Sequence, residues 1–235
     1  MDSVDGDSAV LHGEDAHHLT RVLRVQPGQQ FEITDNRSAW LAEVTEAHAN
    51  QVRFRVVEPV ETPPPLVTIT LCAALIKFDR FEWLVEKATE LGVARIVPFD
   101  AARTEKGLFE AAPKRTERWR KIAKESAQQS RRTTLPEVAQ PVKFAAALET
   151  PAAWRCFLDE GEAPPLLTTL PQPRPADGVA VLLGPEGGWT EDERQRALRA
   201  GWRAASLGPQ ILRAETAAAA ALAVITAAWI AYNEG

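Results

Sequence analysis

Two loops with the sequence Leu-Gly-Pro, at residues 183–185 and 207–209, carry the residue types best suited to bind a ligand. The first continues to Gly188 as Gly-Pro-Glu-Gly-Gly, and each loop follows a short apolar run. Glycines have no Cβ, so the backbone can turn sharply and a ligand can reach its amide groups. Ligands of open α/β sheets bind beyond the carboxyl ends of the strands. If the two strands are parallel neighbours, the loops predict one shared ligand site, whereas either loop alone could be a tight turn without a ligand.

Two charged residues, Arg213 and Glu215, stand just before the alanine-rich run 216–232. A charged side chain that is buried beside an apolar segment is costly unless it is paired or takes part in binding or catalysis. They could pair with each other at a helix start, where Glu215 would also favour the N-terminal dipole. They could equally belong to the ligand site that the neighbouring loop predicts.

The chain does not contain the residue patterns of several common enzyme chemistries. It contains neither the glycine fingerprint of dinucleotide sites nor the phosphate-binding loop of nucleoside triphosphatases. No cluster of His, Cys and Asp has metal-ligand spacing, and no serine occupies a nucleophile elbow. The histidines lie in the first part of the chain, far in sequence from both loops. We therefore expect no metal and no catalytic histidine.

The distribution of charge bears on whether nucleic acid is a partner. The chain has 27 Lys and Arg against 32 Asp and Glu, and its net charge of −5 argues against nucleic acid when taken as an average. Residues 114–132, however, hold eight basic residues and only two acidic ones. Two basic stripes at helical spacing fit phosphate contacts, although either alone could be a solvated helix face. They consist of His17, Arg21 and Arg24, and of Lys114, Arg118, Lys121 and Lys124.

The elements that must position these residues fall on two sides of a proline-rich segment, residues 57–66. Three consecutive prolines favour an extended linker. The preceding sixty or so residues predict a small β-rich domain with one short helix. Its strands are expected at 30–34, 39–44 and 52–57.

The remainder alternates between strands and helices, which predicts a mostly parallel sheet with helices on both faces. Strands are expected at 67–76, 94–99, 154–158, 179–183 and 204–207, and helices at 80–91 and 117–130. The proline-rich stretch 161–178 is interpreted as a surface loop, and run 216–232 as a helix buried in a core or a subunit interface. The two cysteines and the acidic start of the chain favour a reducing, cytoplasmic location without a membrane.

Five segments together resemble the RsmE family of 16S ribosomal RNA methyltransferases, which modify ring nitrogen 3 of a uridine. The resemblance runs from about residue 11 to the end of the chain, with the motifs in the family's order. They are HHLTRVLRVQPG (17–28), FEWLVEKATELGV (81–93), SAQQSRR (126–132), LLGPEGGWTEDE (182–193) and LGPQILRAETA (207–217).

The resemblance implies a SPOUT-type trefoil-knotted α/β methyltransferase domain over residues 66–235, preceded by a small PUA-like β-barrel over residues 1–62. It also implies a homodimer that binds S-adenosylmethionine (SAM) and acts on 16S rRNA, on the 30S ribosomal subunit. By position, SAM contacts are expected from Leu183, Gly184, Pro185, Glu186, Gly187, Gly188, Leu207, Gly208, Ile211, Leu212 and Thr216. RNA contacts are expected from His17, Arg21, Arg24, Arg118, Lys121, Lys124 and Arg132.

The R-x-E-T motif places Arg213 and Glu215 near the transferred methyl. We expect direct transfer, in which Arg213 favours the anionic uracil and Glu215 accepts its proton or holds Arg213. The chain departs from the family's E-Q-x-G-R pattern at Gln128 and Arg131, and the opening strand usual in relatives is not evident. Two alternatives stay open: a ribose 2′-O methyltransferase of the same superfamily, and a non-catalytic RNA-binding or ribosome-assembly protein.

Overall fold

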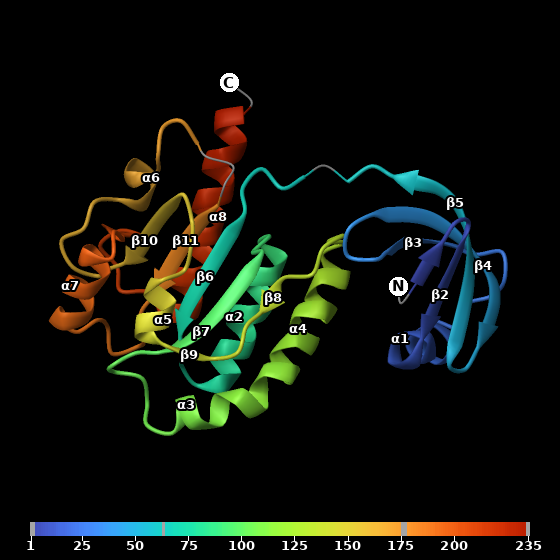
Figure 1. Ribbon diagram of the computed structural model, residues 1–235, viewed down its shortest axis with the longest axis horizontal. Coiled ribbons are helices and arrows are strands. Elements are labelled where there is room, and N and C mark those ends of the chain that lie inside the picture. The colour runs from blue at the N-terminus through green and yellow to red at the C-terminus, as the bar shows by residue number, and fades with distance from the viewer. Residues whose placement is uncertain (1–2, 63, 175–177, 234–235) are drawn as a thin grey trace. The chain divides into compact units, whose positions relative to one another are not determined.

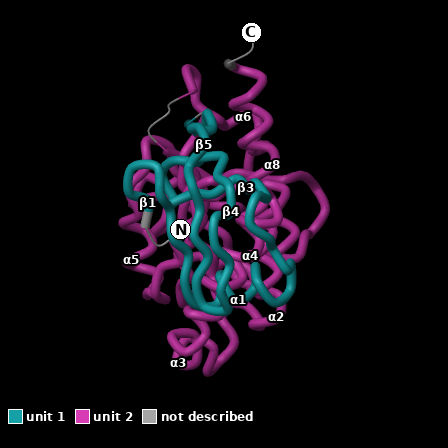
Figure 2. The backbone as a smooth tube through the Cα atoms, turned by 90° about the vertical axis from the view of Figure 1, so that its right-hand side faces the viewer, with its two compact units in different colours: residues 1–64 teal, residues 65–235 magenta. Residues whose placement is uncertain are grey.

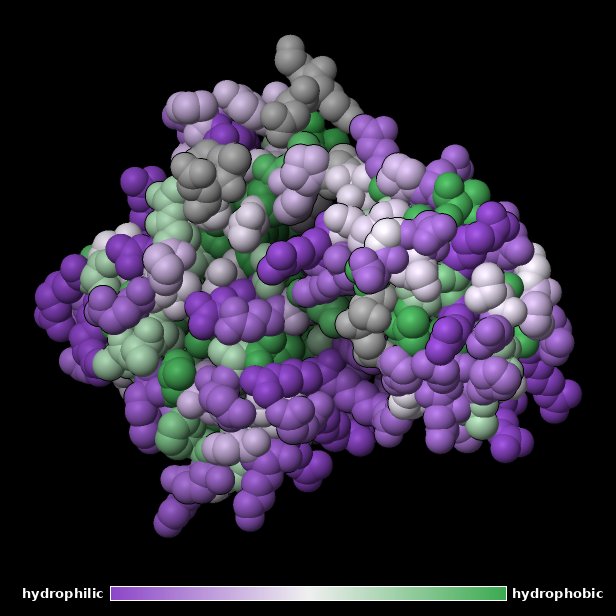
Figure 3. All heavy atoms as spheres, turned by 45° about the vertical axis from the view of Figure 1, so that its right-hand side comes forward, coloured by the Kyte–Doolittle hydropathy of each residue, from purple (hydrophilic) through white to green (hydrophobic). Residues whose placement is uncertain are grey.

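The computed structural model describes residues 3–62, 64–174 and 178–233. The chain divides into two compact units, residues 1–64 and 65–235, which are coloured separately in Figure 2. The division falls within the proline-rich segment. Hydrophilic side chains dominate the face of the molecule seen in Figure 3, with apolar side chains scattered among them.

The first unit is an antiparallel sheet with one helical segment (Figure 1). The strand order is β1-β2-β5-β4-β3, and the apolar side chains of one face meet Ala16 in a small core. The elements are β1 (Ser3–Asp5), β2 (Ser8–His12), α1 (Gly13–His17), the π-helix η1 (His18–Val22), β3 (Gln30–Thr34), β4 (Ala39–His48) and β5 (Gln51–Val60).

The structure extends what the sequence predicted for this unit. Strand β3 lies where it was expected, while β4 and β5 are longer. The chain has a short strand near its start, β1, which pairs with β2, and no comparison relates it to the opening strand of relatives. Among the described residues, the two end strands of this sheet, β1 and β3, are not hydrogen-bonded to each other, so the sheet is open and not a closed barrel. Two irregularities in the β4–β5 pairing bend this sheet, because bulges increase local twist.

The second unit is built on a sheet in which every strand pair is parallel. The strand order is β12-β10-β11-β6-β7-β8, and β9 also pairs with β7. Its strands are β6 (Ile69–Ala74), β7 (Arg95–Asp100), β8 (Glu137–Val138), β9 (Val142–Lys143), β10 (Trp154–Leu158), β11 (Val179–Leu183) and β12 (Arg203–Ala205). Its helices are α2 (Phe78–Glu90), α3 (Leu108–Ala111), the 3-10 helix η2 (Ala112–Arg115), α4 (Thr116–Gln129), α5 (Phe144–Leu148), α6 (Leu166–Thr169), α7 (Glu191–Arg199) and α8 (Ala214–Asn233).

Helices cover both faces of this sheet, as the alternating pattern predicted. Side chains of α2, α4 and α8 share one core with alternate residues of β6 and β11, and α5 and α7 share another core with the opposite faces. Burial on both sides explains why β11 is a continuous apolar run, Val179–Leu183. Helices α2 and α4 and strand β7 each lie within two residues of the predicted bounds.

Helix α8 is long and apolar enough to cross a membrane by length and composition alone. Its Ala218, Ala221, Leu222 and Ile225 instead lie in the core shared with α2 and β11. The interpretation of run 216–232 as a core helix is confirmed. Other residues of α8, including Ala223, Ala227 and Ile230, remain exposed on its outer face.

The sheet order meets only part of the condition that was placed on the two Leu-Gly-Pro loops. The strands before the two Leu-Gly-Pro loops, β11 and β12, are parallel but are not neighbours, because β10 lies between them and pairs with both. Both loops still open at the same sheet edge, with the end of β10 between them. Within the stretch 161–178, the described residues 161–174 form a loop, as expected, but they contain the short helix α6, whose Leu166 is buried; residues 175–177 lie outside the described ranges.

Candidate ligand cavity and RNA-facing residues

A cavity of about 230 Å³ lies at the carboxyl ends of β10, β11 and β12. It brings together nine of the eleven residues predicted to contact a cofactor, and Gly187 and Thr216 do not line it. Arg213 lines it as well. The complete lining is Leu158, Asp159, Glu160, Leu183, Gly184, Pro185, Glu186, Gly188, Trp189, Arg194, Leu207, Gly208, Gln210, Ile211, Leu212, Arg213, Ala214 and Ala217.

The first loop, residues 184–188, needs its glycines for close packing and for its turn. A Cβ at Gly184 would lie 2.9 Å from the Trp189 ring, and a Cβ at Gly187 would lie 3.2 Å from Arg103 Cβ. Gly188 has φ +68°, in the left-handed region. The guanidinium of Arg103 donates to Gly187 O at 2.8 Å. Arg80 of α2 forms an ion pair with Glu186, so the loop is held from the neighbouring β7 and α2 segments.

Thr190 and Glu193 have the S/T-x-x-E spacing of a capping box, and the start of α7 carries one. Glu193 N donates to Thr190 Oγ1 at 3.3 Å, and Thr190 N donates to Glu193 Oε2 at 2.9 Å. The other carboxylate oxygen, Glu193 Oε1, accepts a hydrogen bond from Ala102 N at 2.8 Å. Glu193 therefore both caps α7 and joins it to the loop after β7, which explains why this carboxylate is buried.

The end of β10 forms a part of the cavity that the sequence did not point to. Asp159 accepts hydrogen bonds from Arg194 Nε at 2.8 Å and from Nη2 at 3.0 Å. Burial opposes ionisation of Asp159, but Arg194 and the amide of Gly161 outweigh it and lower the pKa of this carboxyl. Trp189 Nε1 donates to Leu158 O at 2.7 Å. The apolar run 154–158 predicted a strand, but only the sheet order places its end between the two loops.

The second loop, residues 206–212, is also shaped by a glycine. Gly208 has φ +119°, and its amide donates to Ser206 Oγ at 3.1 Å. Ile211 is 78% exposed although it lines the cavity, whereas Leu207 and Leu212 pack against the core. An apolar side chain at the mouth of a cavity can cover part of a bound ligand.

Arg213 and Glu215 do not form the pair that was one of the two expectations. No ion pair or hydrogen bond of either side chain occurs within residues 3–62, 64–174 and 178–233. Arg213 is exposed, and its carbonyl accepts the first hydrogen bond of α8, from Ala217 N at 2.8 Å. Glu215 is 9% exposed, and its Oε2 is buried without a hydrogen-bond partner in the described part of the chain. A buried oxygen of this kind is suited to a proton or to a donor from a ligand.

The basic stripe of the first unit differs from its prediction. His17 ends α1 and Arg21 lies in the π-helix, while Arg24 lies beyond both with φ +52°. The three side chains are all exposed, but they do not share one regular helical face. The cause is the π-helix, a local departure from α geometry that often marks functional sites.

The basic residues of the second unit are partly engaged within the protein. Lys114 lies in η2, outside α4, so the α4 stripe is shorter than predicted. Arg118 forms two hydrogen bonds with Glu82, of 2.6 and 2.8 Å. Arg132 donates to the carbonyls of Thr89 and Val93 at 2.7 and 2.9 Å, and burial lowers the pKa of its guanidinium. These contacts give Arg118 and Arg132 a structural role as well, and RNA contact by Arg118, Lys121, Lys124 and Arg132 stays a prediction.

Other reactive groups lie away from the cavity. No cluster of three or more His, Cys, Asp or Glu able to hold a metal occurs among the residues whose positions are described. Both cysteines are buried, and burial raises the pKa of Cys72 to about 11. Such thiols are poor nucleophiles at neutral pH.

Comparison with known proteins identifies the family of this chain. Residues 62–226 match the family model of an RNA methyltransferase domain, and residues 11–57 match that of an RNA methyltransferase PUA domain. Ribosomal RNA small subunit methyltransferase E from Synechocystis is 37% identical over 90% of this chain and 70% of its own length. The chain belongs to the ribosomal RNA small subunit methyltransferase E (RsmE) family.

Solved structures agree with membership of the RsmE family. RsmE from Neisseria gonorrhoeae, bound to SAM, has a TM-score of 0.87 and 29% identity, covering 97% of this chain and 95% of that chain. A methyltransferase from Legionella pneumophila in complex with SAM has a TM-score of 0.85 and 30% identity, covering 95% and 93% of the two chains.

Proposed function

We propose that this RsmE family member is a SAM-dependent methyltransferase that methylates N3 of a specific uridine in 16S rRNA, on the 30S subunit. The observation that carries the proposal is the single cavity formed by both Leu-Gly-Pro loops with Arg213 at its edge. SAM-bound relatives of the same fold support the choice of cofactor.

The residues of the cavity suit SAM. Its wall is largely apolar, with Leu158, Leu183, Leu207 and Leu212, and it includes the glycine turns at Gly188 and Gly208. Apolar walls with a few placed polar groups are typical of cofactor sites. Gly184 leaves room for the Trp189 ring, which forms another part of the cavity wall.

Bound SAM supplies an activated methyl group on its sulfonium, so this chain need only align the uracil and assist loss of its N3 proton. Arg213 is exposed at the cavity and can hold the uracil oxygens, which stabilises negative charge on the base. The buried Glu215 Oε2 has no partner within the described ranges, so it can accept the N3 proton. Thr216 follows on the first turn of α8.

The proposed fold is of the SPOUT class with a trefoil knot. The chain after β12 runs beside the loop that follows β10: Ser206 N donates to Pro164 O, and Leu166 N donates to Ser206 O, both at 2.8 Å. It then continues into α8, which packs against α2 and β11 on the face opposite α7. These contacts between distant segments of the chain are the support for the proposed knot.

The RNA partner is proposed to contact both units. The PUA match over residues 11–57 and the exposed His17, Arg21 and Arg24 support an RNA-binding role of residues 1–62. Residues 66–235 would contribute Arg118, Lys121, Lys124 and Arg132 and hold the target uridine. Basic side chains bind RNA through its phosphates. We therefore expect the protein to recognise the shape of folded rRNA and not the base sequence of a double helix.

A homodimer in the cytoplasm completes the proposal. The exposed apolar residues on α8, which include Ile230 (41%) and Tyr232 (44%), and the exposed Leu167 (58%) could be covered by a second copy. Sedimentation analysis should then give twice the mass of one chain.

The decisive experiment is transfer of a tritiated methyl group to 30S subunits from a strain that lacks the enzyme, with the modified nucleoside identified. We expect N3-methyluridine from the wild-type protein. Replacement Arg213→Ala should lower the rate at saturating SAM about 100-fold or more while sparing SAM affinity, because it removes charge stabilisation during transfer. Arg203→Ala, exposed and outside the cavity, is the control. A near-normal rate for Arg213→Ala would contradict its assignment.

The same assay and a calorimetric titration with SAM separate the alternatives. Methylation at a ribose hydroxyl would identify a 2′-O methyltransferase on the same fold. A protein that binds 30S subunits but shows no heat of binding with SAM would be a non-catalytic assembly factor.

A further inference from the structure

The charged side chains that line the cavity are not all engaged. Asp159 pairs with Arg194, and Glu186 pairs with Arg80 of α2. The other two charged residues of the lining are Glu160 and Arg213. Within the described ranges neither has an ion pair or side-chain hydrogen bond, so Glu160 is the lining carboxylate left to meet a ligand.

The backbone of Glu160 is held on both sides. Asp159 N donates to Ala205 O of β12 at 2.9 Å, which continues the strand pairing beyond β10. The Asp159 carboxylate accepts from Gly161 N at 3.1 Å, which closes a tight turn around Glu160. Arg194 of α7 holds the same carboxylate with two hydrogen bonds of 2.8 and 3.0 Å. The turn that carries Glu160 is therefore fastened to β12 and to α7.

The place of Glu160 in the sheet indicates which part of a ligand it meets. Strand β10 lies between β11 and β12, so the turn after it separates the two Leu-Gly-Pro loops. In SAM, the ribose joins the adenine to the methionyl group and is thus the middle of the molecule. A carboxylate has two oxygens that only accept, and a ribose has two adjacent hydroxyls that donate.

We propose that Glu160 binds the ribose of SAM by accepting hydrogen bonds from its hydroxyls, and that Asp159 and Arg194 are positioning residues for Glu160. This inference rests on the proposed function, because it concerns the same cofactor. Glu160 acts on affinity for the nucleoside and takes no part in loss of the uracil proton.

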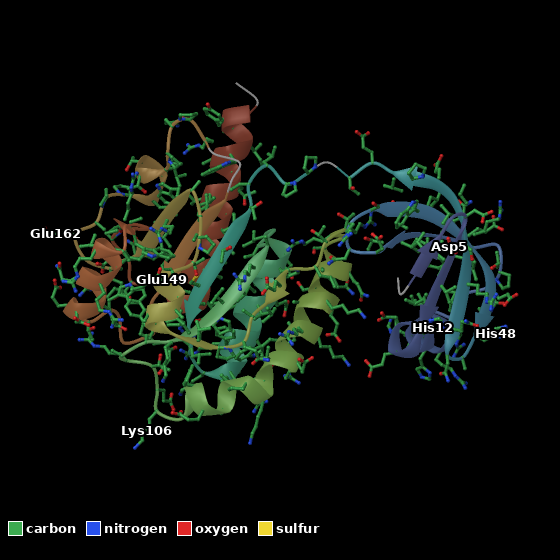
Figure 4. All side chains as sticks on the ribbon, viewed as in Figure 1. Asp5, His12, His48, Lys106, Glu149 and Glu162 are labelled. Atoms are coloured by element: carbon green, nitrogen blue, oxygen red, sulfur yellow. The ribbon has the colours of Figure 1, made fainter. Side chains whose placement is uncertain are left out.

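The test compares two ligands by isothermal titration calorimetry: S-adenosylhomocysteine, and 5′-methylthioadenosine, which keeps the ribose but lacks the amino-acid group. Glu160→Ala should weaken both by the same factor, roughly tenfold to a hundredfold, because it removes hydrogen bonds to a charged group. Glu162→Ala is the matched control: Glu162 lies at the outer rim of the same loop (Figure 4), is exposed and does not line the cavity.

Each other result overturns the inference. Loss of affinity for S-adenosylhomocysteine alone would mean that Glu160 contacts the ammonium group, and unchanged affinity for both ligands would mean that it contacts neither. If wild-type protein bound neither these ligands nor SAM, the proposed function itself would fail, which is a separate outcome.

A double-mutant cycle tests the positioning role. In the wild-type background, Arg194→Met should weaken S-adenosylhomocysteine binding about tenfold. In a protein that already carries Glu160→Ala, the same substitution should have little effect, because Arg194 influences binding only by positioning Glu160. Asp159→Asn, which preserves shape, should behave in the same way if Arg194→Met folds poorly. Equal losses in both backgrounds would show that the pair only supports the fold.

Discussion

At the scale of single residues, Gly184 shows how a missing Cβ shapes the cavity. Trp189, which a Cβ at Gly184 would contact at 2.9 Å, is buried and hydrogen-bonded to Leu158 O, so it cannot move aside. We expect Gly184→Ala to lower the free energy of unfolding by about 1–3 kcal/mol through overpacking, and to weaken SAM binding. Urea denaturation and calorimetry would measure the two effects.

Gly161→Ala is the control for that substitution. A Cβ at Gly161 would lie 3.6 Å from the Asp159 side chain, an ordinary contact, so its stability should stay close to that of the wild type. Equal stability of Gly184→Ala and wild type would contradict the role given to this glycine.

Arg131 is a residue whose backbone conformation conflicts with its type. It has φ +54° just after α4, where Arg131 N donates to Gln128 O and Arg132 N donates to Ala127 O. This is the hydrogen-bond pattern of a helix end that usually carries glycine. The E-Q-x-G-R pattern that the resemblance implies would put glycine here, whereas this chain places a side chain on a backbone conformation that favours glycine.

Arg131→Gly should therefore raise the free energy of unfolding by about 1 kcal/mol, because the left-handed conformation costs a side-chain-bearing residue about that much. Thermal and urea unfolding would measure it. Ser130→Gly is the control, since Ser130 has φ −85° and its hydroxyl donates to Ser126 O, so this change should destabilise instead. A loss of stability in Arg131→Gly would show that the arginine side chain has a compensating contact.

At the scale of elements, the pair Asp159–Arg194 joins the end of β10 to α7. The pKa of Asp159 lies below its ordinary value of 3.8, so the pair contributes stability above that pH and loses it as the pH falls through the lower folded value. We expect the difference in unfolding free energy between wild type and Arg194→Met to stay constant from neutral pH to about pH 5 and to shrink below about pH 4.

Urea denaturation at a series of pH values would test this dependence. A difference that grew as the pH fell would contradict the sign, because protonated Asp159 cannot form an ion pair with Arg194.

At the scale of the whole molecule, a net charge of −5 coexists with an expected RNA surface. Within that surface, Arg118 donates to Glu82 and Arg132 donates to backbone carbonyls, so both arginines also have a structural role. Replacement of Lys121 and Lys124 by Glu should weaken 30S binding and reduce its salt dependence, by about 0.7–0.9 log units per log unit of salt for each phosphate that is no longer neutralised. SAM affinity should not change.

Lys106→Glu with Arg203→Glu makes the same change of net charge at exposed residues outside α4, and Figure 4 labels Lys106 on the loop after β7. If this control pair weakened 30S binding as much as the α4 pair, net charge and not the α4 surface would explain the effect.

The sequence by itself determined the local structure and the main site motifs. Burial on both faces makes β11 a continuous apolar run, the Thr190–Glu193 spacing marks the start of α7, and Gly92 ends the α2 segment with φ +88°. These features depend on residues close in sequence, so pattern and propensity suffice to predict them. The motif resemblance also led to the family, which the comparisons confirm.

Only the tertiary structure decided how distant segments meet. It placed β10 between β11 and β12, which brought Asp159, Glu160 and Arg194 into the cavity, and it left Glu215 Oε2 buried without a partner in the described chain. It also showed that Arg118 donates to Glu82 and that Arg132 donates to backbone carbonyls. Strand order and side-chain pairing depend on packing between residues that are far apart in sequence. The spacing of apolar residues along one segment predicts that segment's secondary structure, but it does not predict which other segments it contacts.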